Sequence, residues 1–134
     1  MDSHFHAFIV VYTLELESLK VRLRKKEAKY SEEYEAGSVS KYVFMENRAL
    51  LENEIIGFDN FIGELHKLDM TKYSTLSELR DALNYLNGKL CEEEGVARSA
   101  AMLAKRKADR IVSYFAESEK ADEEYFTMIE RKKE

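Results

Sequence analysis

Apolar residues recur every three or four positions along most of this 134-residue chain, and the chain contains no proline. Apolar positions at this spacing line up along one side of an α-helix. At ordinary usage of about 5%, roughly six or seven prolines are expected in a chain of this length, and each would break a helix that contained it. The pattern therefore predicts an all-α protein, an antiparallel bundle of three or four long helices with coiled-coil-like seams.

The first predicted helix runs from the Asp2-Ser3 cap to about Tyr34, and the second from about Val39 to Asp69. Between them lies the segment 36–40, in which a glycine suited to the left-handed conformation precedes two serines that can cap the next helix. A short loop here makes the two helices an antiparallel hairpin. One stripe of the first helix alternates steps of three and four residues: Ile9, Tyr12, Leu16, Leu19, Leu23, Lys26 and Tyr30.

A third helix is predicted to begin at Leu76, because Thr75 and Glu78 form a capping box in which side chains and backbone donors satisfy each other. Five leucines then follow at heptad spacing: Leu76, Leu79, Leu83, Leu86 and Leu90. This pattern resembles a short leucine zipper, although ordinary bundle cores contain it as well.

The region after these leucines allows three architectures. A turn at Asn87-Gly88 is favoured, because it places Glu92 to Glu94 in the first turn of a fourth helix, where the helix dipole stabilises them. A turn at Gly95 fits less well, since it leaves those glutamates at a helix C-terminus. An unbroken helix over 76–131 keeps the heptad phase but is roughly 84 Å long at 1.5 Å per residue, so half of it lacks a partner within the chain. The turn at Asn87-Gly88 makes a four-helix bundle.

Composition indicates one soluble domain spanning residues 1–134. Apolar residues make up 45% of the chain and charged residues 35%, which is far from the composition of disordered proteins. The single cysteine, Cys91, cannot form an internal disulfide. The apolar stretch near the N-terminus has no basic segment before it and ends after about eight residues, where a membrane span needs about 20. We therefore expect a cytoplasmic protein without a membrane span.

The sequence contains no recognisable catalytic or cofactor-binding motif. His4 and His6 lie two apart, so on a helix their side chains point about 200° away from each other, and no histidine, His66 included, follows a glutamate by three residues. Glycine-rich phosphate loops and nucleophile motifs are missing as well. We expect a protein that is not an enzyme and that has no cofactor and no metal site.

Two groups of residues are candidates for interaction. The first is apolar, because the start of the first helix carries apolar residues on several faces and something must cover them; its members are Phe8, Val11 and Leu14 together with Leu76, Leu79, Leu83, Leu86 and Leu90. The second is basic and could bind phosphate groups: Arg22, Lys25, Lys29, Lys105, Arg106 and Arg110. In the other interpretation, Arg22, Lys25 and Lys29 flank a helical seam and face an acidic helix, such as one that contains the run 117–124.

Three functions follow from these groups. The leading hypothesis is a non-catalytic intracellular module that binds itself, as a homo-oligomer, or another protein. The first alternative is a nucleic-acid-associated regulator that uses the basic helix faces, although a net charge of −5 weighs against general affinity for nucleic acid. The second alternative is a small acidic accessory inhibitor of a nucleic-acid enzyme, of the kind a mobile element encodes, and only size and charge suggest it.

Overall fold

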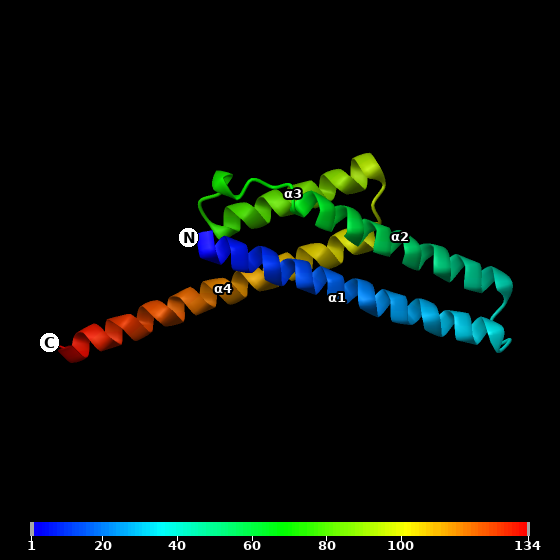
Figure 1. Ribbon diagram of the computed structural model, residues 1–134, viewed down its shortest axis with the longest axis horizontal. Helices are drawn as coiled ribbons and strands as arrows, with labels where there is room; N and C mark the ends of the chain where they lie inside the picture. Colours follow the sequence, from blue (N-terminus) through cyan, green and yellow to red (C-terminus); the bar gives the residue numbers. More distant parts are fainter. Residues whose placement is uncertain (1, 134) are drawn as a thin grey trace.

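The computed structural model describes residues 2–133 and confirms the all-α bundle. Its elements are α1 (Asp2–Glu35), α2 (Lys41–Leu65), a 3₁₀ turn η1 (Met70–Lys72), α3 (Leu76–Glu94) and α4 (Arg98–Lys133). No strand occurs among these residues. Successive long helices run in opposite directions, and α1 also lies antiparallel to α4 (Figure 1).

The loop between α1 and α2 follows the prediction. Gly37 adopts the left-handed conformation with a φ of 78°, and Ser40 caps α2 by accepting a hydrogen bond from the Val43 N–H at 3.2 Å. The second helix is shorter than the predicted span 39–69. It ends at Leu65, because the Asp69 carboxylate accepts a hydrogen bond from the Thr71 N–H and caps the 3₁₀ turn instead.

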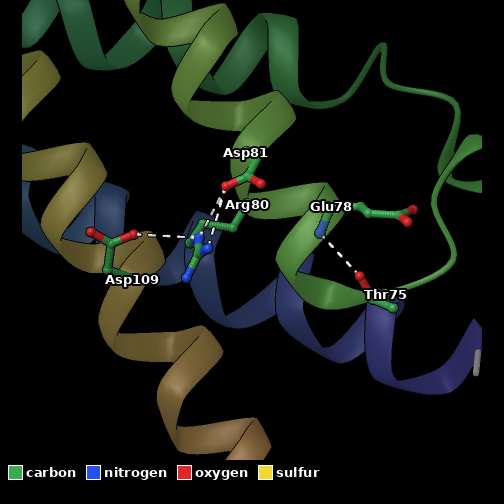
Figure 2. Close-up of polar contacts among 5 residues, drawn as sticks. All are labelled: Thr75, Glu78, Arg80, Asp81 and Asp109. Atoms are coloured by element: carbon green, nitrogen blue, oxygen red, sulfur yellow. Dashed lines mark hydrogen bonds and ion pairs between the residues drawn. The ribbon is translucent and has the colours of Figure 1, made fainter.

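The start of α3 contains the predicted capping residues, with one difference in pairing. Figure 2 shows the Thr75 hydroxyl accepting a hydrogen bond from the Glu78 N–H, 3.1 Å away. The Glu78 carboxylate accepts from the N–H of Ser74 at 2.8 Å, one residue before the position that a capping box predicts. The first bond satisfies a donor that the first turn of a helix leaves free, and the second ties the residue before the cap to that turn.

The break between α3 and α4 falls at Gly95, so the favoured turn at Asn87-Gly88 was wrong. Gly95 has a φ of 69°, and the Val96 N–H bonds back to the Leu90 carbonyl. Asn87 is buried within α3, and its side-chain amide donates to the Ala101 carbonyl of α4 at 2.7 Å. Asn87, which the sequence suggests as a turn residue, therefore joins α3 to α4. Glu92 to Glu94 end α3 with exposed side chains, where water screens their charge against the helix dipole.

All four α-helices share one apolar core. Tyr12 is fully buried there, and its hydroxyl donates to the Ala104 carbonyl at 2.9 Å. Three alanines of α4, Ala100, Ala104 and Ala108, are buried and form a close-packed seam. Across from it, Gly57 of α2 lies against Val96 and Ala100. On the side of α3, Arg80 is 3.8 Å from Asp109 of α4 and adds an ion pair at the rim (Figure 2).

The molecule is elongated, with an arm at each end of the shared core. At one end the α1–α2 hairpin runs past the loop that joins α3 to α4, and at the other end the second half of α4 runs past the start of α1 (Figure 1). We call these the hairpin arm, residues 24–52, and the α4 arm, residues 117–132. Every residue of the α4 arm is exposed except Ile129, which is half-buried. The α4 arm therefore lacks a partner within the described chain, whereas the two helices of the hairpin arm pack on each other.

Candidate interaction surface

The outward side of α1 carries exposed apolar side chains near the middle of the molecule. Val10 is 43% exposed, Leu14 63% and Val21 54%. They lie opposite the buried stripe that contains Tyr12 and Leu16, so they contribute nothing to the core. Val11 is exposed as well and points toward α4.

A groove of about 250 Å³ separates this side of α1 from α4. Val11 and Glu15 form its α1 wall, and Arg110 and Tyr114 belong to its α4 wall. The Lys107 ammonium crosses the groove and lies 3.1 Å from the Glu15 carboxylate. The surface thus combines apolar side chains and an aromatic ring with Arg110, which forms no ion pair within residues 2–133.

The other predicted apolar interaction residues are not part of this surface. Phe8, Leu79, Leu83 and Leu90 are buried in the chain's own core. Leu76 and Leu86 are half-buried against that core. They stabilise the fold, and of the eight predicted residues only Val11 and Leu14 are exposed.

The six candidate phosphate-binding residues are all exposed, and none of them forms an ion pair within residues 2–133: Arg22, Lys25, Lys29, Lys105, Arg106 and Arg110. They do not form one continuous face. Lys105 and Arg110 are about 140° apart around α4 at 100° per residue.

The structure separates the basic part of α1 from the acidic run 117–124, which the sequence predicts to face each other. These segments lie in opposite halves of the molecule (Figure 1). The seam of α1 pairs with α2 instead, because Lys20 contacts Asp59, and Arg24 lies 2.7 Å from Glu52.

These α1–α2 ion pairs change the protonation behaviour of their members. The hydrogen bond to Asp59 raises the pKa of Lys20. A hydrogen bond between the carboxyl groups of Glu27 and Glu52 raises the pKa of Glu27 and lowers the pKa of Glu52. The charge of Arg24 lowers the pKa of Glu52 further. These pairs link α1 to α2, and they leave Arg22, Lys25 and Lys29 of α1 without an ion pair within residues 2–133.

The histidines lie at the start of α1 and the end of α2. His4 Nδ1 is 2.8 Å from a Glu119 carboxylate oxygen, while His6 and His66 line a pocket of about 330 Å³ with mostly apolar walls. Across residues 2–133, no cluster of three or more histidine, cysteine or acidic side chains could hold a metal ion. Cys91 is half-buried and free.

No helix in the described part of the chain has both the length and the apolar character needed to cross a bilayer. No family model matches the sequence, and neither a curated protein nor a solved structure matches it. The case for a function rests on the surface itself.

Proposed function

We propose that this chain is a non-catalytic interaction module that associates with itself through the outward side of α1. The observation that supports this proposal most directly is the exposure of Val11, Leu14 and their apolar neighbours beside the α1–α4 groove. Single exposed apolar side chains are common on protein surfaces, but several on one helix side next to a groove are typical of a binding surface.

The energies favour burial of this side by another molecule. Fully burying a valine or leucine side chain contributes about 1.5–3 kcal/mol. Several such side chains together offset part of the roughly 4–15 kcal/mol that two molecules lose in translational and rotational freedom on association. A partner must therefore bury more than Val11 and Leu14, and a helical surface of the length of α1 offers that area.

The test replaces Val11 and Leu14 with glutamate and follows mass against concentration by light scattering. We expect the wild-type chain to exceed its 15.7 kDa monomer mass and the double variant to remain a monomer with unchanged helicity by circular dichroism. Met45 and Leu50 of α2 are also exposed apolar residues, and glutamates there form the matched control, which should still associate. An equal effect of both double variants would contradict the proposal.

A second candidate function, binding to nucleic acid, has one observation in its favour. The six candidate phosphate-binding cations are exposed and unpaired within residues 2–133. Binding of single- or double-stranded DNA should then weaken steeply with salt, because each neutralised phosphate releases a counterion. Absence of binding at low salt would eliminate this function.

A further inference from the structure

We propose that the partner on the outward side of α1 is a second copy of the same chain, related by a two-fold axis near Val11 and Leu14. In this antiparallel pair the α4 arm of each copy lies along the basic part of α1 in the other copy. The inference rests on the proposed function, since it specifies which surfaces meet in self-association.

The required residues lie on one side of the molecule. The groove places Val11 of α1 and Tyr114 of α4 on this side. Steps of three and four residues follow one face of a helix. From Val11 they lead along α1 through Leu14 and Ser18 to Arg22, Lys25 and Lys29, and from Tyr114 they lead along α4 through Glu117 and Ala121 to Glu124 and Met128.

The two arms also match in distance from the proposed axis. His4 is level with Glu119, and α1 and α4 run antiparallel. At 1.5 Å per residue, Glu124 lies about 20 Å from the level of Tyr12 toward the end of the α4 arm. Lys25 lies about 20 Å from the same level in the opposite direction. A two-fold axis at this level therefore brings Glu124 of one copy beside Lys25 of the other.

The second pair of charges falls close to this register. Glu117 lies about 9 Å from the level of Tyr12, and Arg22 about 15 Å on the other side. The Arg22 side chain is long enough to span this difference of about 6 Å along the helix axis. The two-fold axis repeats both contacts, so two complementary pairs become four.

Charge complementarity favours this occupant over an unrelated protein. The segment 117–124 contains five carboxylates and one lysine, and its side chains are exposed apart from the Glu119 contact to His4. Arg22, Lys25 and Lys29 make no ion pair within residues 2–133. The two charged segments cannot meet inside one chain, because they lie in opposite halves of the molecule (Figure 1). Between two antiparallel copies they meet twice, and a two-fold arrangement closes without exposing a further binding surface.

Apolar contacts complete the proposed interface. At the axis, Val11 and Leu14 of one copy pack on the same residues of the other. Farther out, Tyr125 and Met128 of the α4 arm, both exposed, can cover the aliphatic stems of Lys25 and Lys29. These contacts give Tyr125 and Met128 a partner.

The test exchanges the charges between the two arms and measures the dimer dissociation constant by sedimentation equilibrium. One variant carries Arg22→Glu and Lys25→Glu, a second carries Glu117→Lys and Glu124→Lys, and a third carries all four changes. We expect each double variant to dissociate at least about tenfold more easily, because four attractive contacts become repulsive. The fourfold variant should recover dimers, since its charges are complementary again.

A matched control reverses two charges away from this side, through Lys89→Glu and Glu93→Lys on the exposed surface of α3. This control should leave the dissociation constant unchanged. If the wild-type chain associates and the arm variants behave like the control, the arm pairing is wrong and the proposed function stands. If the wild-type chain is a monomer at every concentration up to about 1 mM, both are wrong.

The position of the axis has an independent test. In a chain with Cys91→Ser, the substitution Leu14→Cys places a single thiol next to its own copy. Mild oxidation should then link most of the protein into covalent dimers, whereas Ser38→Cys at the tip of the hairpin should give few. Equal cross-linking at both positions would overturn the two-fold arrangement.

Discussion

Gly57 is the position where one added methyl group tests the packing of α2 against α4. A Cβ at this residue lies 3.0 Å from Val96 Cγ1 and 3.1 Å from the Cβ of Ala100. The Ala100 Cβ cannot rotate away, so relief requires a shift of the helix. Overpacking of this kind costs about 1–3 kcal/mol, while alanine gains about 1 kcal/mol over glycine in a helix. We expect Gly57→Ala to change the free energy of unfolding by between about zero and 2 kcal/mol, in the destabilising direction.

Gly63 supplies the matched control within the same helix. A Cβ there meets nothing within 4 Å, so Gly63→Ala should stabilise by about 0.5–1 kcal/mol through helix propensity alone. Urea unfolding of both variants at one protein concentration should separate their midpoints by on the order of 1 M. If Gly57→Ala raises the midpoint as much as Gly63→Ala does, the close α2–α4 contact is not present and the reasoning fails.

Three further changes test other parts of the fold. Gly95→Ala should destabilise by about 1 kcal/mol because its φ is positive, while Gly88→Ala should stabilise by a similar amount; thermal melts showing the reverse order would place the helix break at Gly88. Burial raises the pKa of Tyr12, with the charge of Asp109 adding to it, so the folded state holds a proton that the unfolded state loses above pH 10. The contribution of Tyr12 to stability should therefore be constant below that pH and fall above it, and Tyr12→Phe should remove part of the fall in urea titrations repeated at several pH values. Asn87→Asp should cost about 2 kcal/mol or more, since it places a buried carboxylate against a carbonyl oxygen, and the loss should shrink in acid; a pH-independent loss would argue against that contact.

The apolar and charged residues of the candidate surface show why that surface could be predicted only in part from the sequence. The apolar start of α1 was recognisable from sequence, yet Phe8 and Leu14 looked alike there, and only one of them is exposed. Each face of a helix becomes core or surface according to which neighbour covers it. The basic residues of α1 and the acidic run 117–124 were equally recognisable, but the antiparallel packing of α1 on α4 places them in different halves of the molecule (Figure 1).

The sequence by itself determined the helical class, the start of α3 and the glycine loop between α1 and α2. These features depend on periodicity and on caps formed by residues within a few positions of each other. The site of the α3–α4 break depended on contacts between residues farther apart in the sequence. Asn87-Gly88 and Gly95 both carry local turn signals, and the decision came from burying Asn87 against Ala101 of α4. The residues near each turn allow a helix to end at more than one place. Tertiary packing decides between these places, because it determines which polar groups form hydrogen bonds and which side chains are buried.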